Sequence, residues 1–339
     1  MRQLSLTAVL LATLLMPLSA QASTAINWVG GVGTWDAAGA WDAGNGAESA
    51  LDIFSRENGW DSDDGPVNAA ITIGGSDSVV FDKTVPSGTS GDFRLHERTP
   101  GNSASLTVQN GAVFELQSSV HFEGTWTEFD SGPVNVTGAG SVLKRTYHGA
   151  ASTAGALVLG SWRSYDGQEI ELNVEDGGRL ENNGQIWFGS LGENGSGIEV
   201  VVNIDGGHID NTNGSVLIGG HSGISGEIKF NYGFNKDESY AINFGHSGSI
   251  TVDAAGIRIQ EETAPGVYSS IAATYEELWN RDILQVYGLT VQDGLEFNDY
   301  FRVEGQSGSD DYTLIRVPEP TTLALAGLGL SLVAIRRRR

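Results

Sequence analysis

The sequence predicts an all-β protein, folded as a right-handed parallel β-helix with an N-terminal cap and one short C-terminal helix. The first observation is composition: the 339 residues include 47 glycines and 40% hydrophobic residues, but only 18% charged residues. Such a chain is too apolar to stay disordered and too rich in glycine for a bundle of helices. The second observation is that short strand fragments and glycine turns recur through the middle of the chain, as they do in solenoids. A β-sandwich is the alternative, because short strands with frequent turns describe that fold as well.

Charge and cysteine content exclude several functional classes. The chain carries 19 Lys and Arg against 42 Asp and Glu, for a net charge of -23 at pH 7. Such a surface repels a phosphate backbone, so we expect no nucleic-acid partner. Calcium or another divalent cation would be attracted, but weakly and diffusely. Because the chain has no cysteine, disulfides, thiol nucleophiles and cysteine-ligated zinc are excluded together.

Residues 1–22 are expected to be a secretory signal peptide. One positive charge at Arg2 precedes an apolar run from Leu4 to Leu18, and the small-residue triplet Ala20-Gln21-Ala22 follows. This order of charge, apolar run and small residues is typical of a cleaved export signal. The mature chain should begin near Ser23.

Residues 23–82 are expected to form an N-terminal cap and the first coil. The segments Asn27-Trp28, GGVGTWDAAGAW and SVVFD resemble the beginning of autotransporter-associated β-helix proteins. The resemblance implies a cap in which Trp28, Trp35 and Trp41 pack over the end of the core. A platform on which a carbohydrate stacks is the alternative for these tryptophans.

Residues 83–262 are expected to hold most of the β-helix repeats. A three-residue fragment, apolar at both ends with Thr or Asn between, occurs six times from residue 71 onward, and a small-residue or glycine turn follows each copy. This pattern predicts a unit of strand, tight turn and strand. The fragments are Ile71-Thr72-Ile73, Leu106-Thr107-Val108, Val134-Asn135-Val136, Leu172-Asn173-Val174, Val202-Asn203-Ile204 and Ile250-Thr251-Val252.

A second fragment, an apolar pair closed by glycine, lies between copies of the first. The four copies are Leu157-Val158-Leu159-Gly160, Ile186-Trp187-Phe188-Gly189, Val216-Leu217-Ile218-Gly219 and Ile242-Asn243-Phe244-Gly245, so their glycines are spaced 29, 30 and 26 residues apart. Coils of this length stack about 4.8 Å apart and align equivalent side chains. We expect one apolar ladder of Leu106, Val134, Leu172, Val202 and Ile250, with the Asn and Thr column facing the other way.

Residues 263–316 are expected to close the last coil, with a helix over 275–287. Thr274 and Glu277 form a capping-box pattern, and Tyr275, Trp279 and Ile283 recur at helical spacing before Gly288. After this helix, Leu289-Thr290-Val291 is expected to be a seventh strand triplet. The run from Asp311 to Ile315 is expected to be a terminal strand.

Residues 317–339 have the three parts of a sorting and anchoring segment. Val317, Pro318, Glu319 and Pro320 precede an apolar stretch over 321–335, and Arg336, Arg337, Arg338 and Arg339 follow. Fifteen helical residues span roughly 22 Å, short of the ~30 Å hydrocarbon core, but flanking residues extend the reach. The arginines should keep their end in the cytoplasm, which makes 321–335 a transmembrane helix that stops export.

These three parts, in this order, resemble the PEP-CTERM sorting signal of Gram-negative bacteria. The resemblance implies recognition by an exosortase, an integral membrane enzyme that cleaves near Pro-Glu-Pro and passes the protein to the cell surface. An ordinary tail anchor is the alternative.

No motif for catalysis stands out. Gly-His-Ser-Gly occurs at 220–223 and 245–248, but Ile224 and Ser249 stand where a nucleophile elbow needs glycine, so we expect equivalent turns of neighbouring coils. The run from Asp61 to Gly65 lacks the twelve-position loop and bidentate Glu of a calcium site. Basic residues are sparse in the repeats, and no spacing places them beside an acidic cluster; they are chiefly Lys144, Arg145, Arg163, Arg179 and Lys229.

The sequence therefore predicts an exported structural protein of the cell surface or extracellular matrix, without catalysis or cofactor. Its expected partners are an exosortase-type enzyme, the membrane through 321–335 before processing, and exopolysaccharide as a further candidate. A carbohydrate-binding surface protein is one alternative, and would present Trp162, Trp187 and Tyr165 as an exposed row. A β-helical polysaccharide lyase is the other, and would need carboxylates beside a basic residue.

Overall fold

The computed structural model of the chain describes part of its length. The described residues are 24–34, 39–42, 69–82, 93–96, 105–117, 127–130, 133–146, 156–160, 169–188, 199–211, 216–218, 239–252, 256–264, 267–305 and 312–317. The predicted signal peptide (1–22), the predicted transmembrane helix (321–335) and the Asp61–Gly65 run lie outside these residues. No helix within the described part is long and apolar enough to cross a membrane.

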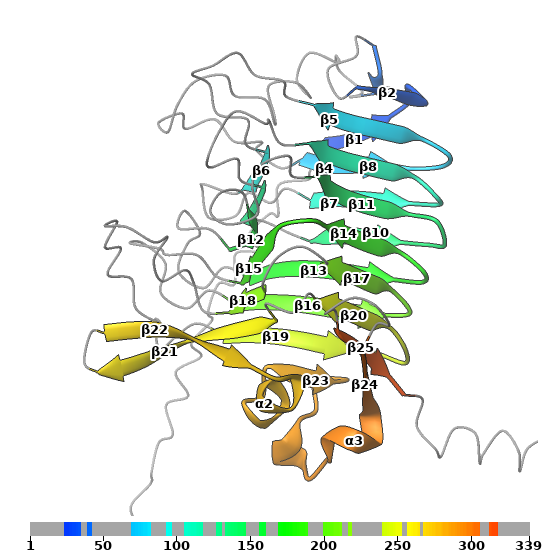
Figure 1. The fold of residues 1–339 in the computed structure, drawn as a ribbon. Coiled ribbons are helices and arrows are strands. Elements are labelled where there is room, and N and C mark those ends of the chain that lie inside the picture. Colours follow the sequence, from blue (N-terminus) through cyan, green and yellow to red (C-terminus); the bar gives the residue numbers. More distant parts are fainter. Residues whose placement is uncertain are drawn as a thin grey trace, which may run out of the picture.

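Three sheets, here named A, B and C, make up this part of the chain and run side by side along one axis (Figure 1). In spatial order, sheet A contains β23 (Leu284–Val286), β19 (Ser239–Phe244), β16 (Glu199–Asp205), β13 (Glu169–Glu175), β10 (Val134–Thr137), β7 (Ser105–Gln109), β4 (Ala69–Ile73), β1 (Thr24–Trp28) and β3 (Trp41–Asp42). Sheet B contains β2 (Val32–Thr34), β5 (Ser78–Asp82), β8 (Val113–Gln117), β11 (Val142–Thr146), β14 (Arg179–Asn182), β17 (His208–Asn211), β20 (Ser249–Val252), β25 (Tyr312–Arg316) and β24 (Phe301–Gly305). Sheet C contains β22 (Val267–Ala273), β21 (Ile257–Ala264), β18 (Val216–Ile218), β15 (Gln185–Phe188), β12 (Ala156–Leu159), β9 (Thr127–Asp130) and β6 (Phe93–His96).

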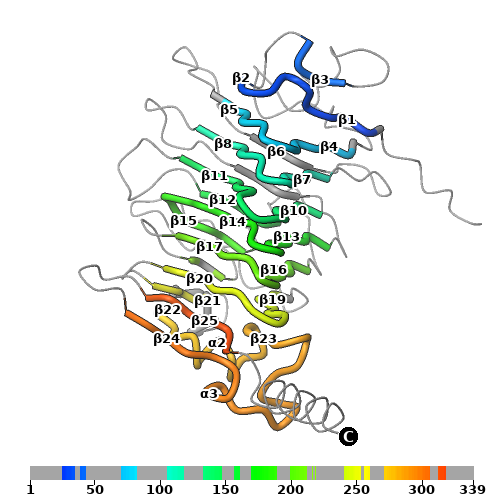
Figure 2. Tube along the Cα trace, turned by 90° about the vertical axis from the view of Figure 1, so that its right-hand side faces the viewer, coloured from blue at the N-terminus to red at the C-terminus, as the bar shows by residue number. Residues whose placement is uncertain are grey.

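From β4 to β21, successive strands enter sheets A, B and C in turn. Each strand therefore pairs in parallel with the strand three places later, as β10 pairs with β13 and β13 with β16. We call three such consecutive strands a coil, and the coils from β4 to β21 the parallel stack. Seen from the side, the coils lie one above another from the N-terminal to the C-terminal end (Figure 2). The prediction of an all-β chain is thus confirmed in its coarse form: large parallel sheets and almost no helix.

The inner face of sheet A is a continuous apolar ladder. Its members are aligned in register and buried: Ile26, Ile71, Leu106, Val134, Leu172, Val202, Ile242 and Leu284. Burial of this column in every coil contributes hydrophobic stabilisation that one coil could not gain alone.

Ile250 was wrongly expected in this ladder. The strand that follows β16 in sheet A is β19, so Ile242 aligns with Val202, whereas Ile250 lies on β20 and aligns with Ile209 in sheet B. Ile242-Asn243-Phe244 was likewise wrongly grouped with the sheet C fragments, whose next member is Ile257-Arg258-Ile259. The triplets that begin at Ile242 and Ile250 both alternate apolar, polar and apolar residues. Only their distance along the chain from the preceding strands distinguishes them. Asn173 and Asn203 occupy equivalent positions 30 residues apart, whereas Asn203 and Asn243 are 40 residues apart. The coil between them is longer than the expected period of 26 to 30 residues.

Tight glycine turns join sheet A to sheet B, as predicted. In the turn after β13, a Cβ on Gly178 would lie 2.1 Å from the Val136 carbonyl oxygen of the previous coil. A Cβ on Gly207 would likewise lie 2.2 Å from the Val174 carbonyl oxygen. Only glycine lets neighbouring turns stack this closely, so these positions fix the coil spacing.

At the N-terminal end, Trp28 and Trp41 pack edge to face, with ring centroids 4.9 Å apart. Both are buried, and the Trp28 indole N–H donates to the Gly31 carbonyl at 2.9 Å. They are packing residues, as predicted for this end of the core. Trp35 lies outside the described residues.

At the C-terminal end, the predicted helix over 275–287 is too long. The helix α2 spans Tyr275–Asn280 and begins at the predicted capping box of Thr274 and Glu277. It stops because Asp282 adopts a positive φ of 61°, after which β23 adds to the edge of sheet A.

The prediction of a single helix and of a strand at 289–291 is also wrong. Thr290 caps the short 3-10 helix η1 (Val291–Asp293), and α3 (Phe297–Tyr300) follows. Its Phe297 packs on Phe301 of β24, so the element serves burial rather than pairing. The predicted terminal strand is present as β25, which pairs antiparallel with β20 and β24.

Candidate functional site

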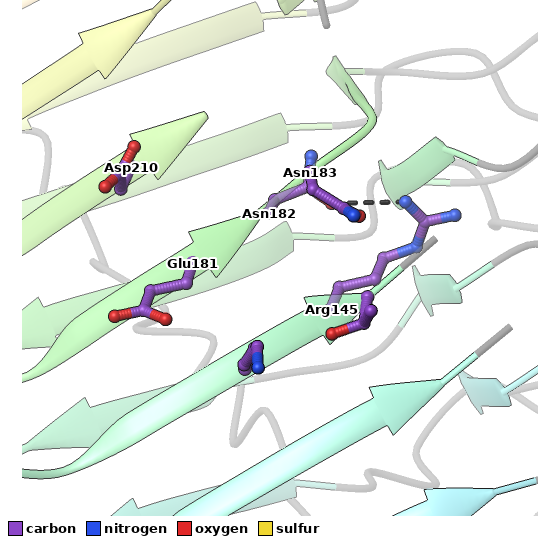
Figure 3. A pocket seen from close by; sticks show the side chains of 7 residues that line it. Arg145, Glu181, Asn182, Asn183 and Asp210 are labelled. Carbon is purple, nitrogen blue, oxygen red and sulfur yellow. Dashed lines mark hydrogen bonds between the residues drawn. The ribbon is translucent and has the colours of Figure 1, made fainter. Parts of the chain in front are cut away.

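An open pocket lies over the ends of β11, β14 and β17 in sheet B. It encloses about 390 Å³ and is lined by Lys144, Arg145, Thr146, Glu181, Asn182, Asn183 and Asp210. Figure 3 shows Glu181 and Asp210 on neighbouring strands, with the Arg145 side chain directed toward Asn182. The parallel register creates this grouping, because Lys144 aligns with Glu181 and Glu181 with Asp210.

Ion pairs surround the pocket. The Lys144 ammonium lies 3.2 Å from Glu115, and the Arg179 guanidinium lies 3.4 Å from Glu181 and 3.9 Å from Asp210. Burial raises the pKa of Glu115, but hydrogen bonds from Thr146 and Lys144 and the Lys144 charge outweigh it and leave this pKa below its ordinary value. Two cationic and two anionic side chains thus line the pocket, in a chain whose net charge is -23.

The floor of the pocket continues into a buried polar ladder. The Arg145 guanidinium donates to the Asn182 side-chain oxygen at 3.1 Å, and the Asn182 amide donates to Asn211 at 2.6 Å. All three side chains are buried. A buried charge is tolerated only when it is hydrogen-bonded in this way, so Arg145 has a clear structural role.

Asp210 carries the least satisfied atom of the pocket. Its Oδ1 is buried and has no hydrogen-bond partner among the described residues. Buried acceptors are normally paired with a donor from protein, water or ligand. The Asp210 side chain is 30% exposed overall and the Lys144 side chain 41%. The other Asp210 oxygen and the Lys144 ammonium therefore give the pocket an acceptor and a donor, as a hydroxyl-rich ligand requires.

Sequence reasoning missed this pocket. No spacing in the sequence places the basic residues beside an acidic cluster, but in the structure β11 and β14 bring Lys144 beside Glu181. The two positions are 37 residues apart in sequence, and only the coil register relates them. The feature of the sequence that could have indicated the pocket is that Lys144, Glu181 and Asp210 each follow a buried apolar residue in a strand.

The outer face of sheet A carries a ladder of amides, as the outward Asn and Thr column predicted. Asn135 donates to Thr107 at 3.3 Å, Asn173 to Asn135 at 2.9 Å, Asn203 to Asn173 at 2.9 Å and Asn243 to Asn203 at 3.0 Å. Each amide both donates and accepts, so the column links five coils on the side opposite the apolar ladder. We name it the asparagine ladder.

Carboxylates gather at the turns next to this ladder. Burial, together with Asp176, Asp205 and Glu171, raises the pKa of Glu175. Asp205 accepts from the His246 backbone N–H at 2.7 Å. Within the described ranges, no group of three or more His, Asp or Glu side chains is placed to hold a metal ion.

The remaining expectations have separate outcomes. Trp187 is buried with Ala156 and Val158, so it is not part of an exposed row; Trp162 and Tyr165 lie outside the described residues. The turn at 245–248 follows a strand of sheet A, whereas the strand before 220–223 lies in sheet C. Residues 220–223 themselves lie outside the described residues, so the expected equivalence of the two segments stays a prediction.

The described part of the chain ends at Val317, the first residue of the predicted sorting signal. The Val317 backbone N–H donates to the Tyr300 carbonyl at 2.8 Å. Pro318, Glu319, Pro320 and Arg336 to Arg339 lie outside the described residues. The described fold therefore reaches Val317, the residue before Pro318.

The identity of this C-terminal segment is settled by comparison. Residues 316–339 match the family model of the PEP-CTERM protein-sorting motif. The chain carries a PEP-CTERM sorting signal. This signal implies export, processing by an exosortase-type membrane enzyme, and a cell-surface or extracellular location in a Gram-negative bacterium. No curated protein and no solved structure matches the chain.

Proposed function

We propose that this chain is a structural protein of the cell surface or extracellular matrix, without catalysis, whose body is a right-handed parallel β-helix delivered by its PEP-CTERM signal. The observation that carries the proposal is the direct joining of the two parts: the sorting motif begins at Arg316, the last residue of β25. A body with such a signal is the cargo of the sorting machinery. The role of the protein at the surface must then follow from the architecture of the folded body.

The strand order supports a β-helix over a β-sandwich. Sandwich sheets are antiparallel, whereas the strand pairs within the parallel stack are parallel and join each strand to the one three places later. Two uninterrupted ladders, one apolar and one of asparagines, run along the opposite faces of sheet A. Such repetition produces an elongated body with like surfaces along its length, which suits a scaffold or an adhesive surface.

Intact mass spectrometry of protein released from the cell surface tests the sorting part of the proposal. We expect a mass that lacks Arg336 to Arg339, because processing separates the body from its anchor. Recovery of the complete C-terminus in the released protein would instead favour an ordinary tail anchor.

Carbohydrate binding at the pocket of sheet B is the second candidate function. It is supported by the balanced charge of the lining residues and by the partly exposed Asp210 carboxylate and Lys144 ammonium among them. A neutral, hydroxyl-rich polymer such as exopolysaccharide offers both donors and acceptors to this lining without adding charge.

Co-sedimentation with exopolysaccharide purified from the source cells tests this candidate. Asp210→Ala should weaken retention about tenfold, since it removes an acceptor for a ligand hydroxyl. Glu304→Ala is the matched control, because Glu304 is an exposed carboxylate paired with Arg302 at 2.8 Å on β24, away from the pocket. Equal retention of the two variants would show that the pocket does not bind the exopolysaccharide.

A polysaccharide lyase is the less supported alternative. It needs a basic group free to take a proton from the substrate. Lys144 is engaged with Glu115, and Arg145 is buried and donates to Asn182. Both contacts favour structural roles for these two residues.

A further inference from the structure

We propose that Arg316 is the positioning residue that sets the upstream limit of the processed C-terminus and keeps the last strand in place once the anchor is removed. The inference rests on the proposed processing by an exosortase, and it concerns the folded side of that reaction. It follows from how β25 and its final residue are held.

The strand β25 lies inside sheet B rather than at its edge. It pairs with β20 on one side and with β24 on the other, and its Leu314 is fully buried. Loss of this strand would therefore uncover the core at the C-terminal end. Yet in the processed protein β25 becomes the chain terminus, where strands commonly fray.

Arg316 holds that terminus from several sides. Its side chain is buried at 3% exposure. The guanidinium donates through Nε to the Gly245 carbonyl at 3.3 Å and through Nη1 to the Tyr300 carbonyl at 3.2 Å, and also to the carbonyl of Val317. These acceptors come from the turn after β19, from α3 and from the chain end itself, so one side chain ties three segments together.

Aromatic rings and the backbone complete the contact. The Arg316 guanidinium carbon lies 5.0 Å from the Tyr300 ring centroid and 6.0 Å from that of Tyr287, within the range of a cation–π interaction. The Arg316 backbone N–H donates to the Gly248 carbonyl at 3.0 Å. We call Arg316 and these acceptors the arginine lock.

The arginine lock determines which peptide bonds an enzyme can reach. A protease needs several residues in extended, accessible form, and residues up to Val317 are paired or buried unless the strand opens locally. The processed chain should therefore retain Arg316 and end at Val317 or later.

Carboxypeptidase Y digestion of the full chain, followed by intact mass measurement, tests the lock. The wild-type protein should be shortened as far as Val317 and then resist. Arg316→Ala should let digestion continue into β25 at least about tenfold faster, because hydrogen bonds to a charged group shift a local opening equilibrium by such factors. Arg316→Lys keeps the charge and part of the donors, and should give an intermediate rate.

Two further variants serve as controls. Arg302→Ala is the matched control: Arg302 is an exposed arginine on the neighbouring strand β24, paired with Glu304, and its loss should leave the digestion end point at Val317. A six-residue Gly-Ser insertion between Val317 and Pro318 leaves the lock intact, so digestion should remove the insertion and again stop at Val317.

Digestion of the wild-type protein past Arg316, an Arg316→Ala rate equal to that of Arg302→Ala, or a surface-released protein that ends upstream of Arg316 would each overturn the inference. Retention of Arg336 to Arg339 on the released protein would contradict the proposed processing instead. In that case the digestion end point still decides whether the lock exists.

Discussion

The parallel stack and the C-terminal end of the same molecule are built on different principles. In the stack, a strand such as β13 lies between two near copies of itself, so each position is supported by its equivalent above and below. At the C-terminal end, β25 lies between two antiparallel strands of unrelated sequence, and α2 and α3 fill the core. The difference shows that repeated short strands can bury a core between them, whereas the exposed end of that core must be covered by contacts of another kind.

Val174→Asp should give the largest loss of stability. Val174 is fully buried and aligned with Val136 and Ile204, so a carboxylate there lies between apolar neighbours. We expect a loss of about 4 kcal/mol or more, even after the pKa of the new carboxyl rises. Urea denaturation followed by circular dichroism measures it, and a change below about 1 kcal/mol would show that the inner face of sheet A is not a continuous buried core.

Trp279→Ala should have a smaller and more local effect. Trp279 is buried at 1% exposure and packs edge to face on Phe301. We expect a loss of about 3 kcal/mol, at the low end for this substitution, because the indole N–H has no partner among the described residues and its removal relieves that cost. Hydrogen exchange should show faster opening of the C-terminal end with the stack still protected. Uniform exchange throughout would mean that the two regions unfold as one.

Asn173→Asp should cost about 1–2 kcal/mol. The change removes the hydrogen bond that Asn173 donates to Asn135 and places a carboxylate oxygen against the Asn135 side-chain oxygen. Asn27→Asp is the control, since Asn27 is exposed in the same column on β1. If the two variants lose equal stability in urea, the asparagine ladder contributes nothing beyond an exposed polar face.

Mild acid should destabilise the stack slightly through His208. Burial is the main cause of its lowered pKa, and the Arg179 charge adds to it, against opposing contributions from Asp210, Ser249 and Glu181. Because the unfolded chain takes up the proton first, stability is lost as the pH falls through the ordinary value near 6.5 toward the lower folded value. His208→Gln should reduce the drop in melting temperature between pH 8 and pH 5.5; an unchanged drop would assign it to other groups.

The sequence predicted the stack better than its end for a physical reason. Alternation along Leu172-Asn173-Val174 reports burial directly, since successive side chains of a strand face opposite ways. The identity of the partner strand is not encoded locally, so Ile250 and Ile242 could not be told apart. Beyond residue 280, the positive φ at Asp282 ends a helix whose apolar spacing continues to Ile283, and tertiary pairing of β23 overrides the local pattern.

The pocket and the arginine lock could not be predicted for the same reason. Lys144, Glu181 and Asp210 meet only through the coil register. Arg316 gains its role from carbonyls at Gly245 and Tyr300. By contrast, the sorting signal was readable, because it is a contiguous motif that an enzyme recognises in sequence.

Deletion of one whole coil tests whether the body is built from repeating parallel coils. Removal of residues 169–198 takes out β13, β14 and β15 together, and places β16 in register on β10, because Asn173 and Asn203 occupy equivalent positions 30 residues apart. We expect a shorter protein that keeps its β-rich circular dichroism spectrum, unfolds cooperatively in urea and is still released at the cell surface. An unfolded or insoluble product, beside an intact full-length control, would contradict the repeating architecture and favour a fold in which each strand has a unique partner.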